Sequence, residues 1–374
     1  MKPSKGNSNK LTTALIQLQP FIPHYRSEFF RLLSRKVTQH IFVYEKKEAA
    51  SKANFHIDDN CCEHIANIFI GGKILFYTPL PLLRAKCSAL ILMLNFAHVT
   101  TWLLLLTKFI HKRKIILWGQ GISVKRYIAE EKAPDWKLRL MIALSDGVWL
   151  YTPKELTLWR KLFPNKPMSA LGNTISNIQT ILDNNTPGNK TVLKERYGIT
   201  QRKILIFCAR FETTHRRVDL LIDTIKRLDK DEFGFVIIGA GSYKPNFKEF
   251  PNVYDFGAVY DQNKKSELFS LSDMYFQPGW VGLSIVEAMA YGLPILTFER
   301  SNEILQCVEY AYIKNNENGL IFKTLDDCVE TISNISQERI TYLSVNAKQY
   351  VAENLTMDKM VDNALGVVKN VCGD

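Results

Sequence analysis

A segment near residue 280 brings glycines, a predicted helix start and a carboxylate close together. It runs from Pro278 to Pro294 and reads PGWVGLSIVEAMAYGLP. Gly279 and Gly282 let the backbone approach a ligand, and good helix formers follow from Ser284. Because a helix N-terminus presents free N–H groups and the positive end of its dipole, it suits a phosphate. Glu287, about one turn into the helix, could accept both hydroxyls of a ribose. These features together predict a nucleotide-diphosphate site.

The same segment also has a purely structural interpretation. Ser284-x-x-Glu287 is the pattern of a capping box, in which Glu287 would fold back onto the backbone of Ser284. Gly292 is placed to end the helix in the left-handed conformation, and Pro294 prevents its continuation. The local pattern leaves both interpretations of Glu287 open.

Two arginines precede this segment where a parallel sheet would bind a ligand. Arg210 comes just after the apolar run Ile204–Cys208, and Arg216 follows six positions later. Guanidinium groups stay charged and bind phosphate oxygens in a forked geometry, so both could reach a diphosphate. Solvation of a loop is the alternative for each arginine. Gly239 and Gly241 form a turn that leaves room for a base or phosphate but lacks the complete dinucleotide motif.

Apolar runs alternate with helical patterns along the chain, which indicates parallel sheets with helices on both faces. The expected strands are 14–18, 41–44, 89–95, 115–118, 147–151, 204–208, 234–238, 253–256, 274–277 and 295–298. The expected helices include 25–35, 98–111, 154–162, 218–228 and 265–271. A turn-rich linker at 184–189 separates two such patterns. We therefore expect an N-terminal Rossmann-like domain at 1–182, a second one at 190–355, and a C-terminal helix at 356–374 that can pack back on the first.

The net charge of +11 is unevenly distributed over the 374 residues. Residues 1–180 hold 26 Lys and Arg against 11 Asp and Glu, whereas the remainder holds 22 against 26. A basic first half fits an anionic membrane, a nucleic acid or a phosphorylated lipid, and a basic solvated surface is the alternative. No module that pairs basic residues with exposed aromatics is recognisable, so a nucleic-acid partner is not expected.

Cysteine spacing and hydropathy limit which classes of protein this chain can belong to. The seven cysteines contain no Cys-x-x-Cys pair and lie in no His-rich neighbourhood, so a zinc site is not expected and reduced thiols fit the cytoplasm. The N-terminus lacks an apolar core followed by a cleavage site, which argues against secretion. Residues 89–110 have the length of a membrane span, but their internal polar residues favour a buried strand followed by an amphipathic helix. A single span is the alternative.

In order and spacing, the second half resembles the nucleotide-sugar-binding domain of retaining glycosyltransferases of the GT-B fold, family 4, also called group 1. The features that carry the resemblance are Arg210 with Arg216, Gly239 with Gly241, Phe256-Gly257, Ser272-Asp273, the block from Gly282 to Pro294, and the run from Glu317 to Phe322. They cover roughly residues 200–325, and the central block is highly specific. The resemblance implies an α/β chain of GT-B architecture, with two doubly wound Rossmann-like domains facing each other across a cleft.

The resemblance also implies a role for each matching residue. Arg210 and Arg216 would neutralise the donor diphosphate and stabilise it as a leaving group, so neither a metal nor another cofactor is expected. Glu287 would hold the ribose, and the backbone at Leu283 and Ser284 would contact phosphate. The expected donor-binding residues are Gly239, Gly241, Gly282, Leu283, Ser284 and Glu287.

One position departs from the family pattern. The family usually has two glutamates separated by seven residues, and Gly279 stands at the place of the first, near the donor sugar. The departure permits a non-catalytic GT-B partner subunit as an alternative. A nucleotide-sugar epimerase of the same architecture is another, although acid and base residues matching that family are not found.

Two residues of the first half are also candidates for the active site. His24, between the first strand and the first helix, could orient an acceptor, and a structural histidine at a helix start is the alternative. Gln120 lies in Trp118-Gly119-Gln120-Gly121, where relatives often carry a histidine near the donor sugar. A glutamine can hydrogen-bond a hydroxyl there but does not titrate.

The resemblance and the charge lead to one expectation of function. We expect a retaining, metal-independent hexosyltransferase that moves a sugar from a nucleoside-diphosphate sugar to a polyprenyl-diphosphate-linked glycan. The expected pathway is bacterial surface polysaccharide synthesis, such as lipopolysaccharide O-antigen, capsule or exopolysaccharide. The basic first domain leads us to expect a cytoplasmic, peripheral enzyme on the anionic inner face of the plasma membrane.

Overall fold

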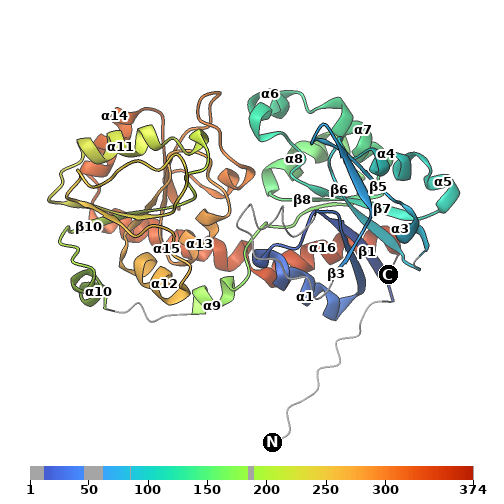
Figure 1. The fold of residues 1–374 in the computed structure, drawn as a ribbon, viewed down its shortest axis with the longest axis horizontal. Coiled ribbons are helices and arrows are strands. Elements are labelled where there is room, and N and C mark those ends of the chain that lie inside the picture. Colours follow the sequence, from blue (N-terminus) through green and yellow to red (C-terminus); the bar gives the residue numbers. More distant parts are fainter. Residues whose placement is uncertain (1–11, 46–61, 85, 184–188, 374) are drawn as a thin grey trace, which may run out of the picture. The chain divides into compact units, whose positions relative to one another are not determined.

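The computed structural model describes residues 12–45, 62–84, 86–183 and 189–373, which form two α/β units (Figure 1). Unit 1 contains the described residues up to Ser176 together with those from Met357 onward, and unit 2 runs from Asn177 to Thr356. The chain thus crosses into unit 2 once and returns to unit 1 for its last helix. Most of the linker expected at 184–189 lies outside the described residues.

Unit 1 is built on a seven-stranded sheet with the order β3-β2-β1-β6-β7-β8-β9. All neighbouring strands of this sheet run parallel. Its strands are β1 (Ala14–Gln19), β2 (Thr38–Val43), β3 (Cys62–His64), β6 (Ala89–Met93), β7 (Lys114–Gly119), β8 (Gly147–Leu150) and β9 (Met168–Ala170). Parallel strands covered on both faces are nearly continuous apolar runs, which is why the sequence pattern identified the central ones.

The helices of unit 1 cover both faces of this sheet. They are α1 (Ser27–Lys36), α3 (Leu80–Arg84), α4 (Val99–Leu106), α5 (Lys108–His111), α6 (Tyr127–Lys132), α7 (Trp136–Leu144), α8 (Pro153–Leu162) and α16 (Met357–Cys372). Short 3₁₀ turns, η1 (His24–Arg26) and η2 (Val124–Arg126), precede α1 and α6. The single helix expected at 98–111 is wrong in detail, because the chain breaks it at Thr107 into α4 and α5.

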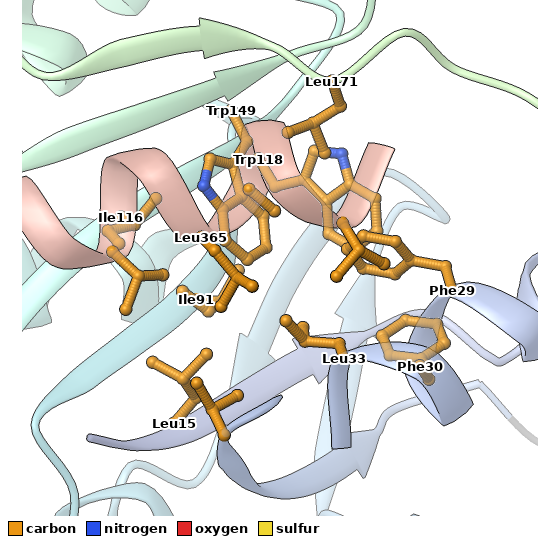
Figure 2. Close-up of a cluster of buried hydrophobic side chains, with 14 of the residues drawn as sticks. Leu15, Phe29, Phe30, Leu33, Ile91, Ile116, Trp118, Trp149, Leu171 and Leu365 are labelled. Atoms are coloured by element: carbon orange, nitrogen blue, oxygen red, sulfur yellow. The ribbon is translucent and has the colours of Figure 1, made fainter. Parts of the chain in front are cut away.

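The C-terminal helix α16 closes one face of the sheet of unit 1. Figure 2 shows Trp118 and Trp149 beneath this helix, with Phe29 of α1 beside them. The Phe29 ring lies 5.3 Å from that of Trp118, which lies 5.6 Å from that of Trp149. All three side chains are fully buried, and large aromatic rings supply much of the apolar area that stabilises a core.

A two-stranded antiparallel hairpin lies beside the main sheet of unit 1. It consists of β4 (Asn67–Ile70) and β5 (Ile74–Tyr77), and the sequence analysis did not identify it. Gly71, Gly72 and Lys73 join the strands, and the two glycines have φ values of 59° and 67°, in the left-handed region that favours glycine. In the part of the chain that the structure describes, no helix has the length and apolar character needed to cross a bilayer.

Unit 2 is built on a six-stranded parallel sheet with the order β12-β11-β10-β13-β14-β15. Its strands are β10 (Lys203–Cys208), β11 (Phe233–Ile238), β12 (Val253–Asp255), β13 (Met274–Phe276), β14 (Ile295–Phe298) and β15 (Gly319–Phe322). Numbered in chain order, this is the 3-2-1-4-5-6 order of dinucleotide-binding domains. The expectation of doubly wound α/β sheets in both halves of the chain is confirmed.

Helices again cover both faces of the sheet of unit 2. They are α9 (Ile178–Asp183), α10 (Lys190–Arg196), α11 (Val218–Arg227), α12 (Gln262–Leu271), α13 (Ser284–Ala290), α14 (Leu325–Ser333) and α15 (Gln337–Asn354), with 3₁₀ turns η3 (Thr214–Arg216) and η4 (Val308–Tyr312). Helix α12 begins three residues earlier than expected, because Asp261 accepts hydrogen bonds from the backbone N–H groups of Asn263 and Lys264.

Strand order fixes where unit 2 can bind a ligand. Strand β10 pairs with β11 on one side and with β13 on the other, so the chain changes direction across the sheet between β10 and β13. At such a point the connections that follow the two strands diverge and leave a crevice at their carboxyl ends. Arg210 follows β10, and the segment from Pro278 follows β13.

Candidate functional site

The two loops at the switch point of unit 2 are joined directly. One Nη of Arg216 donates a hydrogen bond of 2.7 Å to the carbonyl oxygen of Trp280. The His215 ring stacks on the Trp280 ring, with centroids 4.9 Å apart and planes 18° apart. These contacts hold the arginine loop against the loop that precedes α13.

Arg216 has the environment of an anion-binding cation. Its Nε is buried without a hydrogen-bond partner, and no carboxylate among the described residues forms an ion pair with its guanidinium. Burial lowers the pKa of Arg216, and the neighbouring charge of Arg210 acts in the same direction. Because a guanidinium carries five donors and stays charged, the remaining ones favour an acceptor with negative charge. Arg210 is exposed two residues after the end of β10, near the start of the loop.

Gly279 is glycine because protein backbone fills the space beside it. A Cβ built at this position would lie 2.5 Å from the carbonyl oxygen of His215 and 3.0 Å from Cγ of Arg217. The interpretation that Gly279 admits a ligand is therefore wrong, because the chain itself makes the close approach. An acidic side chain, which the family pattern places here, does not fit between the two loops as they pack.

Two buried glutamines, which the sequence analysis missed, fix the loop before α13. Gln277 donates from Nε2 to the carbonyl oxygen of Trp280 at 2.7 Å, and its Oε1 accepts from Tyr275 and Ser284. Gln306 accepts from the N–H of Val281 at 2.9 Å and donates to acceptors on β14 and the loop. Both side chains are fully buried, and satisfied polar groups of this kind hold one backbone conformation.

Gly239 and Gly241 serve the packing of the arginine loop. Their φ values are 148° and 147°, within the region that favours glycine. A Cβ at Gly239 would overlap the carbonyl oxygen of Ala209, and one at Gly241 would lie 2.5 Å from the carbonyl of Phe211. Backbone atoms of the arginine loop therefore fill the space beside Gly239 and Gly241 that we expected a base or phosphate to occupy. The role of these two glycines in donor binding stays a prediction.

Glu287 is paired with a lysine from another helix. Nζ of Lys265, on α12, donates to Oε2 of Glu287 at 2.7 Å, and the two side chains are 20% and 14% exposed. Burial acts to lower the pKa of Lys265, but the Glu287 carboxylate raises it, and the net change is upward. The lysine thus stays cationic, and Oε1 of Glu287 is left for another donor such as a ribose hydroxyl, a role that stays a prediction.

The capping-box interpretation is wrong. Helix α13 begins at Ser284 with Leu283 as its N-cap, and no side chain caps it. Oγ of Ser284 donates to Gln277 at 3.1 Å instead, while Glu287 faces Lys265. The predicted end of the helix is confirmed, since Gly292 follows it with φ at 77°. A Cβ at Gly282 would have only the Cys307 sulfur within 4 Å, at 3.9 Å, so the approach to α13 is open on this side.

The candidates of the first half lie at the carboxyl edge of the sheet of unit 1. His24 is exposed in η1, in the connection that follows β1, and Gln120 is half-buried directly after β7. Arg26, which we had not selected, is buried at the same edge. It donates to Asn173 at 3.0 Å, and its guanidinium carbon lies 4.9 Å from the Trp118 ring centroid. A buried cation on aromatic rings gives this edge a fixed positive charge.

The described residues contain no group of three or more His, Cys, Asp or Glu side chains placed to hold a metal ion. Charged groups at the switch point of unit 2 include the two arginines and the Lys265–Glu287 pair. The order and spacing of residues in the sequence predicted the two arginines and Glu287 as site residues. Lys265 could not be predicted in this way, because it lies on α12, a separate helix.

Comparison with known proteins agrees with this arrangement. Residues 202–338, which contain the switch point, match the family described as glycosyl transferases group 1. A curated relative from Haemophilus influenzae, named an uncharacterized glycosyltransferase, is 24% identical over 241 residues. That match covers 61% of this chain and 63% of the relative's own length.

Solved structures share the fold along nearly the whole chain. Anabaena HepE in complex with UDP and glucose has a TM-score of 0.61 at 12% identity, over 96% of this chain and 100% of that one. The lipopolysaccharide outer core galactosyltransferase WaaB has a TM-score of 0.62 at 13% identity, over 96% and 99%. A proposed UDP-N-acetylglucosamine 2-epimerase from Listeria monocytogenes has a TM-score of 0.59 at 12% identity, over 96% of each chain. The chain thus has the GT-B fold, and residues 202–338 form a domain of the group 1 glycosyltransferase type.

Proposed function

We propose that this chain is a retaining, metal-independent glycosyltransferase that uses a nucleoside-diphosphate sugar. The observation that carries the proposal is Arg216, a half-buried cation at the switch point of a group 1 domain, whose Nε is buried without a hydrogen-bond partner and which has no carboxylate partner among the described residues. A diphosphate would supply the missing negative charge and accept from the free guanidinium donors. Glu287 would accept the ribose hydroxyls through the oxygen that Lys265 does not occupy.

The proposed reaction exchanges one bond at the anomeric carbon. The bond from C1 of the sugar to the β-phosphate oxygen would break, while the acceptor hydroxyl oxygen bonds to C1 on the same face. The hydroxyl proton would pass to the departing phosphate oxygen, so atoms and charge balance without a protein nucleophile. Arg210 and Arg216 would stabilise the charge that develops on the leaving diphosphate. Electrostatic stabilisation of this kind is the largest contribution to the rate enhancement of many enzymes.

The proposed acceptor is a polyprenyl-diphosphate-linked glycan of bacterial surface polysaccharide synthesis, met at the inner face of the plasma membrane. Support comes from the basic first half of the chain and from the similarity to WaaB, which acts on the lipopolysaccharide outer core. His24 and Gln120, at the carboxyl edge of unit 1, would contact the acceptor and the donor sugar. The fold alone does not separate a transferase from an epimerase, since both kinds of protein share it.

Donor hydrolysis tests the proposal. The purified chain is incubated with UDP, GDP, TDP and ADP sugars, and release of nucleoside diphosphate and free sugar is measured, with product anomers followed by NMR. We expect one donor class to be hydrolysed, and Arg210→Ala and Glu287→Ala to slow hydrolysis by about 100-fold. Arg202→Ala is the matched control, because Arg202 precedes β10 at the opposite end of the strand from Arg210 and its side chain is 76% exposed. Interconversion of nucleotide sugars without release would favour an epimerase, and no turnover with any donor would contradict the proposal.

A further inference from the structure

The hairpin β4–β5 has an outer face made entirely of apolar side chains. Its register places Ile68 opposite Phe76 and Ile70 opposite Ile74, so these four share one face. Their exposed fractions are 67%, 38%, 55% and 43% in the same order. The other face buries Leu75 and Tyr77 in the core of unit 1. Antiparallel strands with one solvated face ordinarily place polar residues there, so this outer face is built for an apolar surrounding.

A neighbouring helical surface has the same character. Val99, Leu103, Leu106 and Ile110 are spaced at helical intervals along α4 and α5 and form one exposed stripe, with exposures from 36% to 67%. Phe109 lies beside the stripe and is 78% exposed. Helix α4 packs against β5, and the N–H of Leu75 donates to the carbonyl of Ala97 just before this helix (Figure 1). The hairpin and the stripe therefore belong to adjacent elements of unit 1.

The sequence between Glu63 and Glu130 carries charge of one sign, and acidic residues beyond it pair with three of its cations: Asp146 with Lys108 and Lys114, and Glu130 and Asp135 with Arg126. No Asp or Glu occurs between Glu63 and Glu130. Nine basic residues fall in the same interval: Lys73, Arg84, Lys86, Lys108, Lys112, Arg113, Lys114, Lys125 and Arg126. Lys73 lies in the hairpin turn and Lys112 is the C-cap of α5, and both are exposed. Long basic side chains can lie along apolar surface with their charges at the level of lipid head groups.

We propose that the outer face of β4–β5 and the α4–α5 stripe together form a docking surface for an anionic lipid bilayer. Apolar side chains would enter the head-group boundary, and the surrounding lysines and arginines would contact anionic lipid. A protein partner fits less well, because lysines are depleted at protein interfaces. This docking surface deepens the proposed function by naming where the chain would contact the membrane. It rests on that function in one respect, namely that the lipid-linked acceptor would be met at the membrane.

Vesicle binding of the full chain tests the inference. Sedimentation is measured with vesicles of phosphatidylcholine alone and of phosphatidylcholine mixed with phosphatidylglycerol, at low and high salt. We expect binding to the anionic vesicles that salt weakens without abolishing. The paired variants Phe109→Ser with Ile110→Ser, and Ile68→Ser with Phe76→Ser, should each lower the partition coefficient at least about tenfold. Tyr342→Ser with Val345→Ser is the matched control, since both side chains are exposed on α15 in unit 2, at 51% and 59%.

Each outcome separates this inference from the proposed function. A chain that hydrolyses a nucleotide sugar but does not bind anionic vesicles, or whose variants bind as well as wild type, overturns the docking surface and leaves the transferase intact. A chain that binds vesicles through these residues but acts on no donor supports the surface and contradicts the transferase. If the variants convert a dimer to a monomer by light scattering while vesicle binding is unchanged, the surface is an interface between two copies and the inference is wrong.

Discussion

At the scale of single residues, the site depends on charges that are held in place by partners from other elements. The pair formed by Lys265 and Glu287 joins α12 to α13, and both side chains are mostly buried. Removal of one member leaves the other as an uncompensated charge, which destabilises more than removal of both. The pair therefore ties the proposed ribose ligand to the stability of unit 2.

A double-mutant cycle on this pair separates its contribution to stability from its contribution to ligand binding. We expect Lys265→Met to lower the free energy of unfolding by about 3 kcal/mol, because Glu287 then stays buried without its cation. Lys265→Met with Glu287→Gln should recover most of that loss in urea unfolding, yet should still bind nucleoside diphosphate more weakly than wild type. A double variant that binds the nucleotide as tightly as wild type would show that Glu287 does not contact the ligand.

Gly279 makes a second prediction at this scale. Because the carbonyl of His215 lies 2.5 Å from where a Cβ would be, Gly279→Glu should destabilise the chain by about 1–3 kcal/mol and should not raise donor hydrolysis. Gly366→Ala is the control, since a Cβ at that position of α16 meets nothing within 4 Å. An increase in hydrolysis by Gly279→Glu would mean that the two loops can separate to admit the acid of the family pattern.

At the scale of elements, the loop after β10 is positioned by the loop after β11. Gly239→Ala forces a Cβ onto the carbonyl oxygen of Ala209, at a φ that alanine rarely adopts. We therefore expect this change to shift the arginine loop and to weaken nucleotide binding more than tenfold, with a loss of stability of about 2 kcal/mol. Calorimetric titration measures the first effect and urea unfolding the second. Unchanged affinity in the variant would show that the loop is not held by this contact.

The elements also show why some features could be predicted from the sequence and others could not. The central strands are continuous apolar runs buried on both faces, so their pattern is local. The hairpin β4–β5 was not predicted because its outer face is apolar, so the alternation of polar and apolar residues expected of such strands is missing. The Lys265–Glu287 ion pair was not predicted because its partners lie 22 positions apart on different helices. The close approach of His215 to Gly279 likewise depends on tertiary packing of two loops.

At the scale of the whole molecule, the last helix belongs to the unit in which the chain began. Met360 on α16 is buried in the core that contains Trp118 and Trp149, whereas Leu343 on α15 is buried in the core of unit 2. Five of the six tryptophans lie in unit 1, so tryptophan fluorescence reports mainly on that unit.

Matched truncations of these two side chains test the division of the chain. We expect Met360→Ala to lower the stability reported by tryptophan fluorescence by about 2–5 kcal/mol, because it opens a cavity beside the indole rings. Leu343→Ala should leave that transition in place and lower the stability of a second transition, seen by far-UV circular dichroism, which reports on the helices and strands of both units. Equal shifts of both transitions by both variants would indicate one cooperative folding unit rather than two.

We propose that the switch point of unit 2 binds a nucleoside diphosphate through Arg216. The most direct measurement is the thermal midpoint of the full chain with UDP, GDP, TDP or ADP, for wild type, Arg216→Ala and the control Arg202→Ala. We expect one nucleotide to raise the midpoint of wild type and of Arg202→Ala, because binding to the folded state stabilises it, and the rise to be lost in Arg216→Ala. No shift with any nucleotide, or an equal shift in Arg216→Ala, would contradict the proposal.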